Sequence, residues 1–259
     1  RQLPHMKNYF CCTLALLLLS LTATHVPTPV KAAPPVALAR ADESFYASLT
    51  SLLQRHVQGG MVNYKTLQRD GKLLQDLVRK VAQYDLKGAA GTEKKAFYLN
   101  AYNVLVLQQV LEHYPLKSVM DVPGFFDSKR HEVAGEPLTL NELEQQKLLV
   151  PFQDARIHFA LVCAARSCPP LLSNAYLPDQ VEKQLEAQAR QALQNPDFIR
   201  VQPGERQVLV SEIFRWYQQD FLREAPSVIA YINRYRKAAL PKQYALGYYT
   251  YNWRLNEVQ

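Results

Sequence analysis

The chain has 259 residues, of which 30 are Lys or Arg and 23 are Asp or Glu, giving a formal net charge of +7. Three of the basic residues and none of the acids fall within residues 1–32, so the rest of the chain carries 27 basic and 23 acidic residues and a net charge of +4. So small an excess does not support nucleic-acid binding, which requires basic residues clustered on one face or along one helix.

Residues 1–32 have the pattern of a leader and secretory signal peptide. Lys7 precedes an apolar run from Tyr9 to Leu21, which is shorter than the ~20 residues that span a bilayer, and Val30-Lys31-Ala32 is a small-x-small cleavage site. We therefore expect a periplasmic or secreted protein that is cleaved after Ala32. The alternative is an uncleaved segment that anchors the chain in a membrane.

The remaining chain is long enough for one large domain, and it contains no repeat or low-complexity tract. We predict a Pro- and Ala-rich linker over residues 33–41 and a single globular domain over residues 42–259.

The first half of this domain is predicted to be helical. Apolar residues recur at helical spacing over 43–57 and over 64–84, and the short segment "MVNY" between them favours a strand. After Gly91, "EKKAFYLNAYNVLVLQQVLEHYP" is apolar around its whole circumference, which is typical of a buried central helix.

Asn100 and Asn103 lie one turn apart on that central helix. A buried amide without partners costs about 1–3 kcal/mol, so we expect both to be hydrogen-bonded. Two roles are open: a structural tie to neighbouring backbone, or the orientation of a histidine, as the third member of a Cys-His-Asn arrangement does.

The second half mixes strands and helices. We predict a hairpin centred on Gly135, a helix that starts with the capping box Thr139/Glu142, and an interior strand over "RIHFALVC" because both of its faces are largely apolar. A helix from about Pro178, a hairpin turning at Pro203-Gly204, further helices after Ser211 and Pro226, and a last strand in "YALGYYTYNW" follow. The class is α+β, a mainly helical single domain with a small, mostly antiparallel sheet.

Several segments come in the order and spacing of a known family: "AFYLNAYNVLVL", "HEVAGEPLTLNELEQ", "RIHFALVCAARSCPPL", "SEIFRWYQQDF" and "YTYNWRLN". Over residues 45–256 the chain resembles the domain of unknown function 547 family. The resemblance implies an exported or membrane-associated bacterial domain and no assigned activity. Where many relatives look like "IEH", this chain has Leu143-Glu144-Gln145, so any general base at that histidine would be missing here.

The stretch "HFALVCAARSCPP" carries the candidate chemistry. Beyond the leader the only cysteines are Cys163 and Cys168. A thiol-dependent hydrolase or acyl-transferase acting on envelope peptides would use one of them as nucleophile and His131 or His158 as base, with Asn100 as the orienting residue. On a regular strand His158 and Cys163 point to opposite faces, which favours His131 as the partner.

Three other interpretations compete with catalysis. In an oxidising compartment Cys163 and Cys168 favour a disulfide, which is the pairing we predict. Their spacing with the histidines does not match a zinc motif, so we expect neither a metal nor another cofactor. The aromatic residues of the C-terminal third suit a non-catalytic module that binds a peptide, glycan or other small molecule, and a groove lined by Tyr248, Tyr251 and Trp253 would favour it.

The leader gives a direct prediction about processing. Mature protein recovered from the envelope should begin within a few residues of Ala33, because the small-residue site follows the apolar run. Amino-terminal sequencing measures this, and a sequence starting at Met6 would contradict it.

Overall fold

The structure is a computed structural model that describes residues 36–258, with side chains from Ser44 onward. The predicted signal peptide lies outside these residues. By its internal contacts the chain from Ala37 to Gln259 forms one compact unit. Among the described residues, no helix has both the length and the apolar character needed to cross a membrane.

The N-terminal helices follow the sequence pattern with one correction. Helix α1 (Val36–His56) starts within the segment predicted as a linker, and a small hairpin of β1 (Val57–Gln58) and β2 (Met61–Val62) follows it, as "MVNY" indicated. The single helix predicted over 64–84 is wrong. This segment divides into α2 (Tyr64–Leu67), a 3-10 turn η1 (Gln68–Asp70) and α3 (Gly71–Gln83). The 3-10 turn has fewer residues per turn than an α-helix, so it rotates α3 relative to α2. Both helices can then bury their apolar residues.

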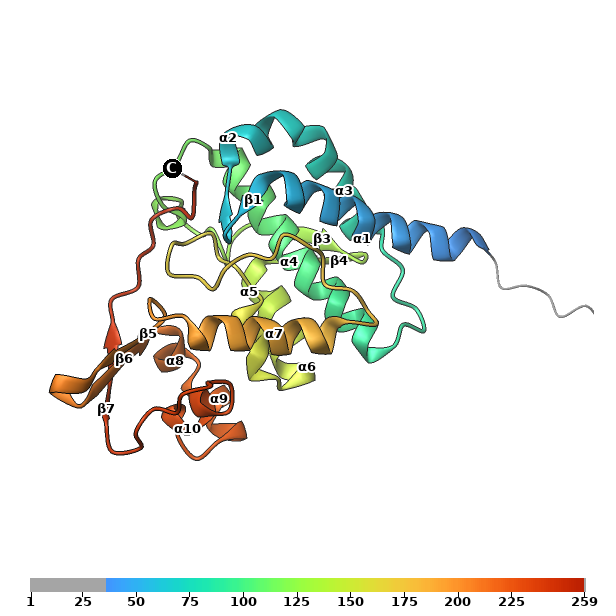
Figure 1. The fold of residues 1–259 in the computed structure, drawn as a ribbon. Helices are drawn as coiled ribbons and strands as arrows, with labels where there is room; N and C mark the ends of the chain where they lie inside the picture. Colours follow the sequence, from blue (N-terminus) through green and yellow to red (C-terminus); the bar gives the residue numbers. More distant parts are fainter. Residues whose placement is uncertain (1–35, 259) are drawn as a thin grey trace, which may run out of the picture. The chain divides into compact units, whose positions relative to one another are not determined.

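Helix α4 (Gly91–His113) is the predicted central helix. Residues around its whole circumference are buried, and α3 and α7 (Val181–Gln194) pack against it (Figure 1). Asn100 and Asn103 are 2% and 6% exposed and both are hydrogen-bonded, as expected. The apolar pattern of this segment therefore reports its position at the centre of the fold.

The next part of the chain contains an irregular helix. After a 3-10 turn η2 (Val119–Asp121), strands β3 (His131–Val133) and β4 (Glu136–Leu138) form the predicted hairpin. Thr139 and Glu142 form the predicted capping box at the start of α5 (Leu140–Glu142). The helical run continues through a π-helical segment, η3 (Leu143–Leu149), into α6 (Val150–Phe152).

The interior strand predicted over 156–163 is not present. Asp154 caps a 3-10 helix, η4 (Ala155–Phe159), and the chain then continues without regular structure. Asn103 supplies what a neighbouring strand would otherwise supply, because its side chain donates to the Ala160 carbonyl at 3.1 Å and accepts from the Val162 amide at 3.0 Å. The continuous apolar run over residues 156–163 therefore indicated that the segment is buried, but it did not indicate a strand.

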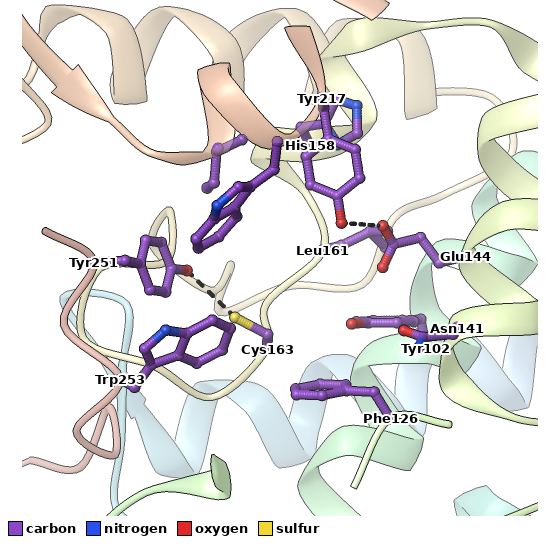
Figure 2. A pocket seen from close by; sticks show the side chains of 12 residues that line it. Tyr102, Phe126, Asn141, Glu144, His158, Leu161, Cys163, Tyr217, Tyr251 and Trp253 are labelled. Carbon is purple, nitrogen blue, oxygen red and sulfur yellow. Dashed lines mark hydrogen bonds between the residues drawn. The ribbon is translucent and has the colours of Figure 1, made fainter. Parts of the chain in front are cut away.

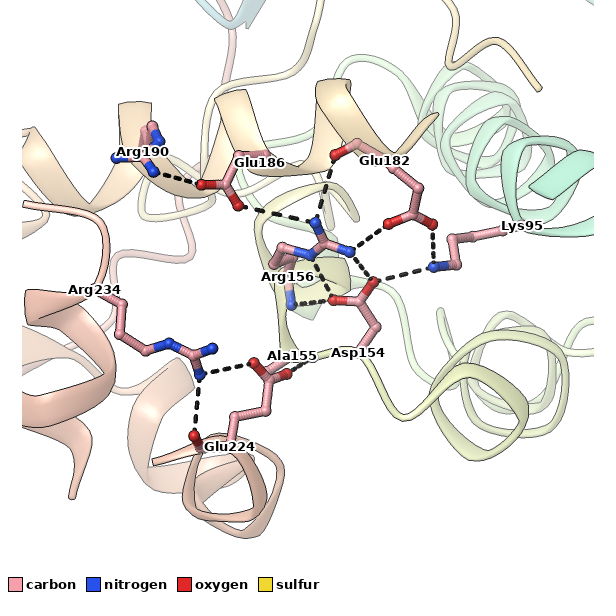
Figure 3. A network of polar contacts seen from close by, with 9 residues as sticks. All are labelled: Lys95, Asp154, Ala155, Arg156, Glu182, Glu186, Arg190, Glu224 and Arg234. Atoms are coloured by element: carbon pink, nitrogen blue, oxygen red, sulfur yellow. Dashed lines mark hydrogen bonds and ion pairs between the residues drawn. The ribbon is translucent and has the colours of Figure 1, made fainter. Parts of the chain in front are cut away.

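An ionic cluster holds the start of η4 in place. Asp154 accepts from Lys95 of α4 at 3.1 Å and from Arg156 at 2.8 Å, and Glu182 of α7 pairs with the same two cations (Figure 3). Glu224 also accepts from the Ala155 amide at 2.9 Å. The cluster joins η4 to three helices and so fixes the direction in which the chain leaves it.

The C-terminal part holds the largest sheet. Strands β5 (Ile199–Gln202) and β6 (Gln207–Ser211) form the predicted hairpin through a 3-10 turn, η5 (Pro203–Glu205), and β7 (Ala245–Tyr249) pairs with β6 in parallel. Between β6 and β7 the chain forms α8 (Ile213–Trp216), α9 (Gln218–Glu224) and α10 (Val228–Asn233). Helices with small, mostly antiparallel sheets give the α+β class that the sequence predicted.

The role of Asn103 generates a stability prediction. Replacement of Asn103 by leucine should lower the free energy of unfolding by about 1–3 kcal/mol, because the Ala160 carbonyl and Val162 amide lose their partner in the interior. Chemical denaturation of the purified protein measures the change.

The matched control is Gln191→Leu, at an exposed position on α7, where a change within ~0.5 kcal/mol is expected. Equal effects of the two substitutions would contradict a structural role for the Asn103 amide.

Candidate functional site

A cavity of about 210 Å³ is lined by aromatic rings together with a glutamate, a histidine and a cysteine (Figure 2). Its walls come from α4, the π-helical segment, η4 and the chain after it, α8, and the segment after β7. The lining residues are Tyr102, Phe126, Asn141, Glu144, His158, Leu161, Cys163, Ile213, Trp216, Tyr217, Tyr251 and Trp253. We call this cavity the aromatic pocket.

The π-helical segment brings a carboxyl group into the aromatic pocket. Such segments carry an extra residue per turn and often occur at functional sites. Glu144 lies on this segment and is only 8% exposed. Burial raises the pKa of Glu144, and the Tyr217 hydroxyl, which donates to its Oε1 at 2.7 Å, opposes that rise.

His158 lies beside Glu144 and is tied to a second carboxylate. Its Nε2 lies 2.7 Å from Oδ2 of Asp220, and its ring packs on Tyr217 with the centroids 4.1 Å apart. The hydrogen bond from His158 holds the pKa of Asp220 below its usual value. The imidazole is therefore oriented by a carboxylate, an arrangement that also occurs at catalytic histidines.

Cys163 and Cys168 form a paired thiol site at the wall of the aromatic pocket. The chain turns back on itself after Cys163, with Ala164 in the left-handed region at φ 60°. The two Sγ atoms are 2.7 Å apart, and the Cys163 amide donates to Cys168 Sγ at 3.2 Å. The Tyr251 hydroxyl lies 3.1 Å from Cys168 Sγ and 3.3 Å from Cys163 Sγ.

The predicted disulfide is not formed in this structure. Both cysteines are free thiols, and their separation of 2.7 Å exceeds the ~2.05 Å of a sulfur–sulfur bond. The short turn brings the two side chains together, as the sequence spacing indicated, but it places them in thiol–thiol contact.

The two thiols differ in their acidity. The hydrogen bond to Cys168 and burial raise the pKa of Cys163. Burial would also raise the pKa of Cys168, but hydrogen bonds from the Cys163 thiol, the Tyr251 hydroxyl and nearby backbone amides outweigh it and lower that pKa. Cys168 is therefore the more acidic thiol of the pair.

The thiols open onto different cavities. Cys163 lines the aromatic pocket, whereas Cys168 lines a separate, more polar cavity of about 520 Å³ together with Arg166, Ser167 and Arg200. Each cysteine residue is partly exposed. The pair is thus reachable from two sides.

The structure brings together only some of the candidate residues. His158 and Cys163 line the same pocket, although the predicted strand would have separated them. His131 lies in β3, where its Nε2 is 2.8 Å from Gln109 Oε1, and burial lowers its pKa to about 4. Asn100 donates to the Ala96 and Tyr176 carbonyls and accepts from the Tyr176 amide. Neither His131 nor Asn100 lines the aromatic pocket, so a Cys-His-Asn arrangement with them is not assembled.

Two further expectations concern the pocket wall. Tyr251 and Trp253 line the aromatic pocket but Tyr248 does not. The three residues therefore do not line one groove, which was the arrangement that would have favoured a binding module. Gln145, which stands where many relatives have histidine, is exposed and does not line the pocket.

The sequence argument missed Glu144, Tyr217 and Asp220. One signal was available for Glu144, because it follows Leu140 by four residues and precedes Leu148 by four, which places a charged residue on the apolar face of that helix. Tyr217 and Asp220 were also three residues apart in "FRWYQQD", close enough to share a helix face. Nothing local connected them to His158.

Among the side chains of residues 44–258 there is no group of three or more His, Cys, Asp or Glu residues that could hold a metal ion.

Comparison with protein families matches residues 86–192 to a family described as "Protein of unknown function, DUF547". This part of the chain belongs to the DUF547 family. The DUF547 segment includes Glu144, His158 and both cysteines, while Tyr217, Tyr251 and the two tryptophans of the pocket follow it. No curated protein and no solved structure matches the chain.

The different acidity of the thiols predicts different alkylation profiles. Because its pKa is lowered, Cys168 should react with iodoacetamide at lower pH than Cys163. Trypsin cleavage after Arg166 separates the two cysteines, so mass spectrometry can follow each one. Tyr251→Phe removes a donor to the thiolate and should move the Cys168 profile to higher pH.

The control is Tyr248→Phe, which removes a tyrosine hydroxyl that does not line the aromatic pocket, and it should leave both profiles unchanged. Identical profiles for the two cysteines, near the ~8.5 of an ordinary thiol, would contradict the assignment of Cys168 as the more acidic thiol.

Proposed function

We propose that the chain is a thiol-dependent enzyme in which Cys163 and Cys168 carry out thiol–disulfide exchange. The observation that carries the proposal is the 2.7 Å contact between the two sulfurs, with the Tyr251 hydroxyl bonded to both. A thiolate with a second thiol in contact has the two parts that exchange requires, an attacking and a resolving sulfur.

The reaction has two steps. Cys168 Sγ, as thiolate, attacks one sulfur of a substrate disulfide, the substrate sulfur–sulfur bond breaks, and one substrate thiolate leaves and takes up a proton. Cys163 then loses its proton and attacks the sulfur of Cys168, which releases the second substrate thiolate. The substrate gains two electrons, the cysteine pair is oxidised to a disulfide, and a dithiol from a second substrate returns it to the reduced state.

A thiol-dependent hydrolase or acyl-transferase is the competing function. It is favoured by the presence of Cys163 and His158 in one pocket, with Asp220 orienting the imidazole. Exchange is supported better because the hydrogen-bonded neighbours of the sulfurs are a thiol, a tyrosine hydroxyl and backbone amides, and His158 is bonded to neither sulfur. An acylating cysteine normally needs an imidazole within hydrogen-bond reach.

We also propose that the protein works after export. The sequence of residues 6–32 supports this, because it has the charge, apolar length and small-residue end of a signal peptide. An oxidising compartment would supply the disulfide substrates that the exchange reaction consumes.

The test compares the two chemistries on the same protein. Full-length protein in which Cys11 and Cys12 are replaced by serine, so that Cys163 and Cys168 are its only thiols, is reduced, freed of reductant and mixed with bis(2-hydroxyethyl) disulfide. Product thiol and protein mass are followed with time, and the expected yield is two product thiols for each cysteine pair oxidised. Cys168→Ser should abolish this release. Cys163→Ser should stop the reaction at a mixed disulfide on Cys168, because the resolving sulfur is missing.

His158→Gln separates exchange from acyl transfer. Exchange should continue at a rate within about threefold of the unsubstituted protein, whereas acyl transfer to Cys163 from a nitrophenyl ester would fall by the ~10²–10⁴ that a general base contributes. The matched control is His113→Gln, at the exposed end of α4. An acyl adduct on Cys163 that depends on His158, with no disulfide turnover, would replace the exchange function by the acyl-transferase function.

A further inference from the structure

Glu144 differs from Asp154, a largely buried acid elsewhere in the described part of the chain, because no Lys or Arg side chain pairs with it. The Asp154 side chain is 10% exposed and is neutralised by Lys95 and Arg156 (Figure 3). These cations outweigh the effect of burial and lower the pKa of Asp154. Among the described residues Glu144 forms no ion pair with Lys or Arg, and its side-chain hydrogen bonds come from the neutral hydroxyls of Tyr217 and Tyr102.

The groups around Glu144 do not supply the cationic partner that it lacks. His158 lines the same pocket, and its Nε2 is already paired with Asp220 Oδ2 at 2.7 Å. None of the residues that line the aromatic pocket is Lys or Arg. A buried carboxylate without a counter-charge costs several kcal/mol unless it takes up a proton or acquires a cationic partner.

The walls of the pocket suit a cation that carries carbon groups. Tyr217, Tyr251, Trp216 and Trp253 contribute aromatic rings, and the rings of the two tryptophans are stacked with centroids 5.8 Å apart (Figure 2 shows Trp253 and Tyr251). Trp216 is 44% exposed, so part of this aromatic wall is open to solvent. Aromatic faces attract Lys, Arg and quaternary ammonium ions within about 6 Å of the ring centre.

The size of the cavity suits a small group. Its volume of about 210 Å³ admits a head group with a few carbon atoms.

From the unmatched carboxylate and the aromatic walls together, we propose that the aromatic pocket is a binding site for a small organic ammonium ion, with the charge against Glu144 and the carbon groups against the tryptophans. The ligand supplies the counter-charge that the protein supplies by itself at Asp154. The proposal goes beyond thiol exchange, since it requires no reaction at either sulfur.

The first experiment compares two probes of equal shape. Choline and its uncharged isostere, in which a carbon atom replaces the nitrogen, are titrated into full-length protein by calorimetry, with tryptophan fluorescence as a second readout. Choline should bind about tenfold more tightly, which corresponds to ~1.4 kcal/mol, because charge and cation–π attraction distinguish it from the isostere. Methylammonium and tetramethylammonium then separate a primary from a quaternary head group.

The second experiment tests the carboxylate. Glu144→Gln should weaken choline binding about tenfold or more and leave the affinity for the uncharged isostere nearly unchanged, because the amide keeps the shape of the side chain and removes its charge. Glu132→Gln, at an exposed strand position in β3, is the matched control and should bind as the unsubstituted protein does. Trp216→Leu, at an exposed position, should weaken choline without altering the fold.

Each outcome decides for or against the ammonium site. Equal affinities for choline and its isostere would show an apolar pocket without charge selection and would overturn the proposal. No heat and no fluorescence change with any ammonium probe at millimolar concentration would also overturn it. If Glu144→Gln fails to fold, the comparison of probes and the Trp216→Leu variant decide alone. Because binding is measured without any thiol reaction, failure here and failure of disulfide exchange are separate results.

Discussion

The arrangement of the site depends on the side chain of Asn103. Its side-chain amide bonds to the Ala160 carbonyl and the Val162 amide, so these two backbone groups have partners although the chain beside α4 has no regular structure there. His158 precedes this stretch and Cys163 ends it. If the stretch moved, the imidazole and the first thiol would move away from Glu144 and Tyr251, which come from other parts of the chain.

The carboxyl groups of Asp154 and Glu144 have different kinds of partner. At Asp154 the protein surrounds a buried carboxylate with its own cations, and the result is a rigid junction between η4 and the helices around it. At Glu144 the carboxyl group receives hydrogen bonds from the Tyr217 and Tyr102 hydroxyls and lines a cavity. The first arrangement is self-sufficient and therefore structural. The second lacks a cationic partner, which a ligand can supply. The cavity at Glu144, and not the ion cluster at Asp154, is therefore the functional candidate.

The paired thiols share a wall with this cavity, and their chemistry is set by their neighbours. Several donors converge on Cys168, so a buried sulfur that would otherwise resist ionisation becomes the more acidic member of the pair. The same contacts make Cys163 the less acidic one. A ligand in the aromatic pocket would lie beside Cys163, the less acidic thiol, while Cys168 lines the separate polar cavity. The proposed ammonium binding and the proposed attack by Cys168 would therefore take place in different cavities.

The sequence by itself determined the features that depend on local spacing. The buried central helix, the paired amides on it, the capping box at Thr139 and the hairpins at Gly135 and Pro203-Gly204 follow from periodicity, hydrogen-bonding side chains and turn residues, which act over a few positions. The closeness of Cys163 and Cys168 followed from their short separation in the same way. Only the tertiary structure decided that "RIHFALVC" is not a strand, because its apolar residues reported burial while the partner that satisfies its backbone is Asn103, more than fifty residues away. Only the tertiary structure joined Glu144, His158, Asp220 and Tyr251 into one site and left His131 and Asn100 outside it. Contacts between side chains so distant along the chain depend on how helices pack, and no local pattern of residues encodes that packing.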